Sequence, residues 1–104
     1  MTIQFNTDNN LSVREGFSKK LQDMLNSELK RFDEIITRLE VHFGDENGHK
    51  KGVDDKRCLL EARVKGKNPV VVTAFASNYE IAAKDAAEKL KKTLNAVLQK
   101  MQAH

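Results

Sequence analysis

Two segments of alternating apolar and polar residues restrict most strongly what this chain can fold into. Residues 58–64 read CLLEARV, and one face of this segment carries Cys58, Leu60, Ala62 and Val64. Residues 35–43 alternate in the same way. We expect one face to carry Ile35, Thr37, Leu39, Val41 and Phe43, and the other Ile36, Arg38, Glu40 and His42. A period of two is typical of a β-strand, and a single apolar face is typical of a sheet covered on one side.

Two segments with helical periodicity can cover that side. The first is predicted to begin at Ser12, which forms a capping-box pattern with Glu15, and its apolar stripe is Val13, Phe17, Leu21, Met24, Leu25 and Phe32. Gly16 in its first turns weakens the helix or allows close approach to the sheet. Ser77 and Glu80 repeat the capping box before a second helix that is predicted to run to Met101. Its stripe is Ala83, Ala86, Ala87, Leu90, Leu94, Val97, Leu98 and Met101, and the alanines favour close packing at its first half.

Segments 2–6 and 70–76 complete the predicted sheet. Residues 2–6 alternate, with Ile3 and Phe5 on one face, whereas VVVTAFA at 70–76 alternates least, so its buried face stays open. A helical crossover between the first two strands joins parallel neighbours. We therefore predict an α+β fold, a single β-α-β-β-β-α domain over residues 1–104. In this dsRBD-like arrangement a four-stranded mixed sheet carries both helices packed on one face.

Length, charge and cysteine content limit the class of protein. A chain of 104 residues with a net charge of +3 fits one small domain, and the charge permits an anionic partner without requiring one. No apolar run could span a bilayer, no signal peptide is visible, and the single cysteine cannot form an internal disulfide. These features favour a reducing cytoplasm. We expect Cys58 to be a buried, unreactive thiol.

Basic residues gather on both predicted helices. No acidic residue follows Glu88, and the candidate phosphate-binding residues are Lys19, Lys20, Lys30, Arg31, Lys84, Lys89, Lys91 and Lys92. Lysines on two neighbouring helices can meet phosphates along a folded RNA, and double-stranded RNA is recognised mostly by its shape and backbone. On charge alone, however, a solvated helix face is the better interpretation.

The connection 44–56 is long and highly charged. Its possible metal ligands are Asp45, Glu46, Asp54 and Asp55, with His42 and His49 as further candidates. Their spacing matches neither a calcium loop nor a familiar zinc site. We interpret the segment as a solvated hairpin tip, with a docking surface second and a metal site third. No catalytic motif is present, so we expect no enzymatic activity, no catalytic residue, no metal and no cofactor.

The chain resembles the family of ribosome hibernation-promoting factors and ribosome-associated inhibitors, also labelled sigma-factor modulation proteins or ribosomal subunit interface proteins. The resemblance covers nearly the whole chain. It rests on the order of elements and on the stretches FDEIITRLEVHF, CLLEARVKG and SNYEIAAKDAAEKLKKTL. The segment 44–56 departs from the family by being longer and more acidic. The chain also stops after the second helix, so we expect it to lack the C-terminal ribosome-dimerisation domain of the long members.

The resemblance implies a bacterial, cytoplasmic, RNA-binding protein of the stress response. Such a protein binds rRNA of the small ribosomal subunit, in the channel for messenger and transfer RNA, and inhibits translation or protects idle ribosomes. The basic residues named above would then contact RNA. A monomer fits the size, and neither a membrane nor a small-molecule substrate is expected. The alternative is a regulatory protein-interaction module that uses the acidic 44–56 loop and the outer sheet face, where Leu59 stands among polar neighbours.

Overall fold

The chain folds into one layer of β-sheet and one layer of helices. The structure is a computed structural model and describes residues 1–7, 15–45 and 55–102. The sheet contains, in spatial order, β1 (Thr2–Thr7), β2 (Ile36–Asp45), β3 (Lys56–Val64) and β4 (Val70–Ala76). The helical layer contains α1 (Glu15–Glu28), the short 3-10 helix η1 (Lys30–Phe32) and α2 (Tyr79–Gln102).

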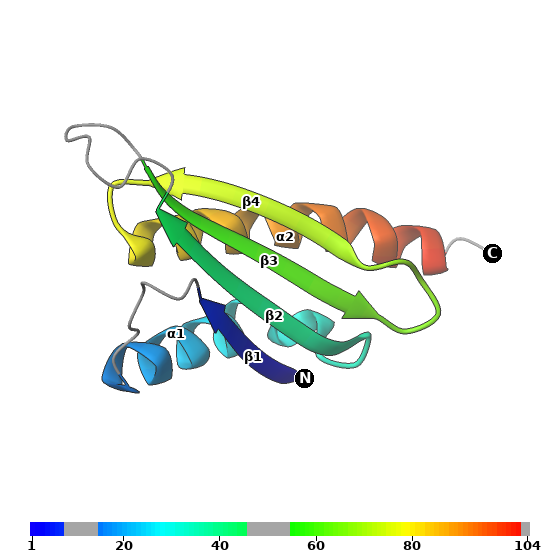
Figure 1. Ribbon diagram of the computed structural model, residues 1–104. Helices are drawn as coiled ribbons and strands as arrows, with labels where there is room; N and C mark the ends of the chain where they lie inside the picture. Colours follow the sequence, from blue (N-terminus) through cyan, green and yellow to red (C-terminus); the bar gives the residue numbers. More distant parts are fainter. Residues whose placement is uncertain (8–14, 46–54, 103–104) are drawn as a thin grey trace.

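Strand pairing agrees with the predicted mixed sheet. β1 runs parallel to β2, with Thr2 opposite Arg38 and Phe5 opposite Val41. The pairs β2–β3 and β3–β4 are antiparallel. α1 connects the two parallel strands, and both helices cover the same face of the sheet (Figure 1). The predicted α+β architecture is therefore confirmed.

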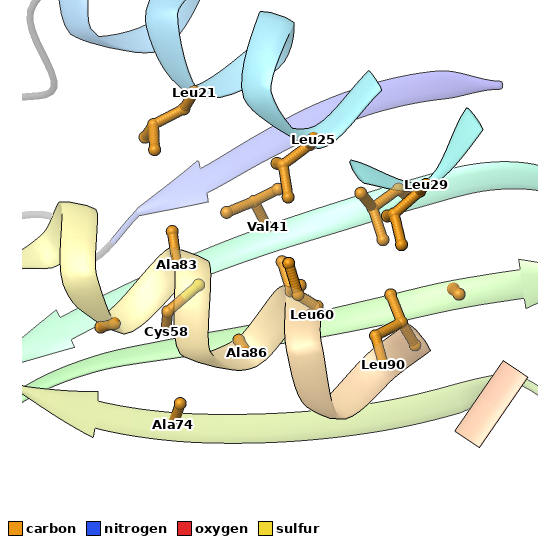
Figure 2. Packing of buried hydrophobic residues seen from close by; sticks show 14 of the residues in the cluster. Leu21, Leu25, Leu29, Val41, Cys58, Leu60, Ala74, Ala83, Ala86 and Leu90 are labelled. Carbon is orange, nitrogen blue, oxygen red and sulfur yellow. The ribbon is translucent and has the colours of Figure 1, made fainter. Parts of the chain in front are cut away.

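The core fills the space between the sheet and the helices. The sheet contributes the buried side chains Leu39, Val41, Phe43, Cys58, Leu60, Ala62, Val64, Ala74 and Ala76. The helices contribute Leu21, Leu25, Ala82, Ala83, Ala86, Ala87, Leu90 and Leu94. Figure 2 shows the alanine-bearing turns of α2 close to the strands, with Ala83 and Ala86 near Cys58 and Leu60. Full burial of each leucine side chain contributes about 1.5–3 kcal/mol, so this layer supplies much of the stability.

The start of β2 differs from the predicted alternation. Ile36 is buried and Thr37 is exposed, which is the reverse of the expectation, and Ile35 precedes the strand and is only half-buried. The pairing with β3 shifts between Ile36 and Arg38, because Ile36 faces Val64 and Arg38 already faces Arg63. Thr37 is thus the extra residue of a β-bulge, and a bulge reverses the phase of alternation on either side of it.

The ends of the helices also differ from the capping-box predictions. At α2 the backbone N–H of Ile81 donates to Asn78 Oδ1 at 2.8 Å, so the N-cap is Asn78 rather than Ser77. At α1 the predicted cap Ser12 lies outside the described residues. A side chain at Gly16 would have nothing within 4 Å, so the expected close approach to the sheet at this residue is wrong. Neither described helix is long and apolar enough to cross a membrane.

The structure shows which face of β4 is buried, a question that the sequence left open. Ala74 and Ala76 are buried, and Val70 and Val72 pack against the core. The outer face of β4 carries Val71, Thr73 and Phe75. Val71 is 53% exposed and Phe75 is 48% exposed. The strand therefore presents two large apolar side chains to solvent.

The cap of α2 can be tested by paired substitutions. Asn78→Ala should lower the free energy of unfolding by about 1 kcal/mol, because it removes the acceptor of the Ile81 N–H. Ser77→Ala should change it by a few tenths of a kcal/mol at most. Urea unfolding followed by circular dichroism measures both values. If Ser77→Ala lowered the free energy of unfolding more than Asn78→Ala, the N-cap would be Ser77.

Candidate nucleic-acid interface

The two helices lie side by side and run in the same direction. Near their starts, Lys20 Nζ of α1 lies 3.1 Å from Glu80 Oε1 of α2. At the end of α1, Glu28 Oε2 accepts a hydrogen bond of 2.8 Å from Lys91 Nζ. These ion pairs join the helices at two levels and place basic residues of both helices on a common surface. Sequence spacing could not reveal either pair, because the partners are far apart along the chain.

Lys91 is the more strongly held of these lysines. Its ammonium donates to Glu28 and also lies 3.3 Å from Glu88 Oε1. The hydrogen bond to Glu28, followed by that to Glu88, raises the pKa of Lys91 above its usual value. An RNA phosphate would have to compete with two carboxylates for this ammonium. Lys91 therefore acts first as a clamp between α1 and α2.

Lys19 and Lys20 form weaker pairs. Lys19 Nζ lies 3.5 Å from Asp23 Oδ1 one turn along α1, and both side chains are exposed. The partner of Lys20, Glu80, is also partly exposed. Exposed ion pairs contribute between zero and about 1 kcal/mol, so a phosphate can replace the carboxylate at little cost.

Four of the predicted phosphate-binding residues form no ion pair with a carboxylate of the described residues. Lys84 and Lys92 are exposed on α2, and neither forms an ion pair with any described residue. Lys30 and Arg31 are exposed on η1, at the end of α1, and the Arg31 guanidinium lies 5.7 Å from the centre of the Phe32 ring. We call these residues the free-cation set: Lys30, Arg31, Lys84 and Lys92. They project from the helical layer and are available to anions.

Lys89 lies on a different flank of α2. Its Nζ donates to the backbone carbonyl of Thr73 in β4 at 2.7 Å. Lys91 reaches α1, whereas Lys89 reaches the opposite edge of the sheet. The structure thus brings most of the predicted basic residues to the α1–α2 surface and sets Lys89 apart from them.

The outer face of the sheet carries a group of ion pairs that the sequence did not indicate. Glu40 of β2 faces Glu61 of β3. Arg38 Nη2 lies 3.0 Å from Glu40 Oε2, and Arg63 Nε lies 3.0 Å from Glu61 Oε2 and 3.8 Å from Glu40 Oε2. Asn6 also donates to Glu40 at 3.1 Å. Arg38 and Arg63 on this face are thus paired with Glu40 and Glu61.

Only the two ends of the charged connection 44–56 are described. Lys56 Nζ donates to Asp45 Oδ2 at 2.7 Å and lies 3.5 Å from Asp55 Oδ1. The hydrogen bond to Asp45 raises the pKa of Lys56. The other possible metal ligands, Glu46, His49 and Asp54, lie outside the described residues. Within the described ranges, no three such side chains form a group that could hold a metal.

Cys58 lies in the core. Its side chain is fully buried under α2, and burial raises the pKa of the thiol to about 12, against a smaller lowering effect of Arg57. Reactive cysteines are accessible and have a lowered pKa. The prediction of a buried thiol is confirmed.

Comparisons with known proteins identify the family and the fold. The sequence model of the family described as "Sigma 54 modulation protein / S30EA ribosomal protein" matches residues 7–102. No curated protein matches the chain in sequence. Among solved structures, the N-terminal domain of Protein Y from Thermus thermophilus matches with a TM-score of 0.70 and 15% identity, over 93% of this chain and 99% of that domain. A ribosomal subunit interface protein from Coxiella burnetii matches with a TM-score of 0.66 and 15% identity, over the full length of both chains. At this identity the two structures establish a shared fold.

The clamp formed by Lys91 predicts a pH-dependent contribution to stability. Because folding raises the pKa of Lys91 above 10.5, its stabilising effect is complete below that pH and is lost as the pH rises through the folded-state pKa. Urea unfolding midpoints should therefore be lower for Lys91→Met than for the wild type at about pH 8, and the difference should shrink as the pH rises through the raised pKa of Lys91. Lys92→Met is the matched control, because Lys92 has no carboxylate partner among the described residues. Equal effects of both substitutions would contradict the clamp.

The buried thiol predicts protection from chemical modification. In the native protein an aromatic disulfide reagent should modify Cys58 only at the rate of unfolding, since the thiol is inaccessible and its pKa is about 12. In denaturant the same reagent should react at once. Spectroscopic release of the reagent's chromophore measures both rates. Rapid modification without denaturant would show that α2 opens readily over β3.

Proposed function

Because the chain belongs to the Sigma 54 modulation protein / S30EA ribosomal protein family, we propose that it binds rRNA of the small ribosomal subunit and inhibits translation or protects idle ribosomes. Family membership makes it a ribosome-associated protein, and the proposal adds the subunit, the RNA and the consequence. In this proposal the protein acts by occupying a site on the ribosome. It needs no cofactor and no small-molecule substrate.

The observation that carries the proposal is the free-cation set. Lys84, Lys92, Lys30 and Arg31 are exposed on the helical layer, and no described carboxylate neutralises them. Cations in this state gain most from phosphates, because they release condensed counterions from the RNA without first breaking an ion pair. Recognition of this kind reads the shape and the backbone of folded RNA rather than the base sequence.

The paired lysines have supporting roles in this proposal. Lys19 and Lys20 can exchange their exposed carboxylates for phosphates at small cost. Lys91 holds α1 against α2 through Glu28, and this contact keeps the cations of both helices in one relative arrangement. Lys89 is directed to the edge of the sheet, so its contact with RNA would have to come from a second surface of the ribosomal site.

The alternative, a regulatory protein-interaction module, depends on the outer sheet face and the 44–56 loop. The exposed side chains of Val71 and Phe75 support a protein contact there, whereas Arg38 and Arg63 on the same face are already paired with Glu40 and Glu61. In this alternative, substitutions on the helical layer would leave the partner bound. The experiment on the free-cation set therefore separates the two proposals.

Cosedimentation with ribosomes tests the free-cation set. The double substitution Lys84→Glu and Lys92→Glu should weaken binding to the small subunit by roughly tenfold or more at near-physiological salt, because it replaces attraction for phosphates by repulsion. Single substitutions Lys84→Gln and Lys92→Gln should each reduce the slope of log affinity against log salt by about one. The matched control is Lys65→Glu with Lys67→Glu, which changes the net charge equally at the exposed β3–β4 turn.

The control decides between the possible outcomes. Wild-type-like binding of the Lys84 and Lys92 double variant would place the RNA contact on another surface. An equal loss in the turn variant would mean general attraction to a polyanion rather than a defined interface. Loss in the helix variant alone supports the proposal.

A further inference from the structure

The outer edge of β4 has no partner strand among the described residues. β4 is the last strand of the sheet and pairs only with β3 (Figure 1). Its seven residues, VVVTAFA, contain no charge and no proline. An uncharged edge strand presents free N–H and C=O groups to other strands, and natural proteins usually protect such an edge.

The exposed side chains of β4 are arranged symmetrically about Thr73. Val71 and Phe75 lie two residues to either side of it on the outer face and are 53% and 48% exposed. If a second copy added its β4 antiparallel about Thr73, each Val71 would lie opposite the Phe75 of the other copy. Aromatic and β-branched side chains form favourable cross-strand pairs. A twofold interface makes each such contact twice, so the strand is complementary to itself.

Lys89 lies at the centre of this symmetry. Its ammonium donates to the Thr73 carbonyl at 2.7 Å. The carbonyls of an antiparallel strand point alternately toward its partner and away from it, and this contact places the Thr73 carbonyl on the free edge. A second strand would have to displace the ammonium from its acceptor. It would also bring the Lys89 of the second copy close to the first, and like charges repel.

We propose that the free edge of β4 is a self-association surface for a second copy of this chain, and that the Lys89–Thr73 hydrogen bond keeps it closed. Lys89 alone would block the second strand, because it lies where the twofold axis of the dimer would pass. Displacing it would join two four-stranded sheets into one continuous sheet. The proposal concerns the opposite flank of α2 from the free-cation set and does not depend on RNA binding.

Sedimentation equilibrium of the nuclease-treated, purified protein tests this assignment. The wild type should be a monomer, and Lys89→Ala should lower the dimer dissociation constant by about tenfold or more. Alanine is the best helix former, so the substitution should leave α2 folded. Lys89→Arg keeps the cation near the carbonyl and should remain monomeric. Lys92→Ala is the matched control, because it removes an equal charge from the same helix away from β4.

A second substitution shows whether the dimer uses β4. Adding Val71→Lys to Lys89→Ala should restore the monomer, because it places a charge on the edge strand. In the Lys89→Ala dimer, the amide hydrogens of Val71, Thr73 and Phe75 should exchange more slowly with solvent than in the wild type. A monomeric Lys89→Ala protein, a wild type that already dimerises through β4, or a dimer that Val71→Lys leaves intact would each overturn the proposal.

Discussion

The close approach of α2 to the sheet determines the arrangement of the rest of the molecule. Ala82, Ala83, Ala86 and Ala87 are all buried, so the first half of α2 contributes only methyl groups to the layer between the helix and the strands. A larger side chain at these positions would lift the helix and open the layer below it, at a cost of about 1–3 kcal/mol. Because α2 is held so close, its two flanks meet different neighbours: α1 on one side and the edge of β4 on the other.

This position divides four of the lysines of α2 into three kinds. Lys91 meets the carboxylate of Glu28 and ties the two helices together. Lys89 meets a backbone carbonyl at the edge of the sheet. Lys84 and Lys92 meet no described carboxylate and keep their charge available. Lysines along one helix therefore have different neighbours, because the helical period directs each side chain to a different side of α2.

The parts of the fold that depend on local pattern could be predicted from the sequence. β3 alternates without interruption, and its buried and exposed faces are as predicted. The start of β2 could not be predicted, because the bulge at Thr37 is defined by the pairing with Val64 and Arg63 on another strand. Ser77 and Asn78 are both good N-cap residues, and only the backbone geometry shows which of them accepts the bond.

The candidate site was less predictable for the same reason. The sequence identifies the lysines, but their state depends on tertiary neighbours. Glu28 and Glu80 compensate Lys91 and Lys20 across the helix pair, and neither partner is close in sequence. Lys89 and Lys92 are the same type of residue on the same helix, yet Lys89 reaches the edge of the sheet and Lys92 does not. Charge patterns therefore indicate a basic helical layer, and only the packing shows which cations are free.

The parallel pairing of β1 with β2 has a consequence for the order in which the chain assembles. β2, β3 and β4 join neighbours in sequence, and α2 follows directly, so these contacts close short loops. β1 pairs with β2 only after the chain has passed through α1, as the pairing of Thr2 with Arg38 requires. Closing a longer loop costs more entropy and raises the contact order. We therefore expect β1 and α1 to dock last during folding and to detach first during local unfolding, while β2, β3, β4 and α2 stay together.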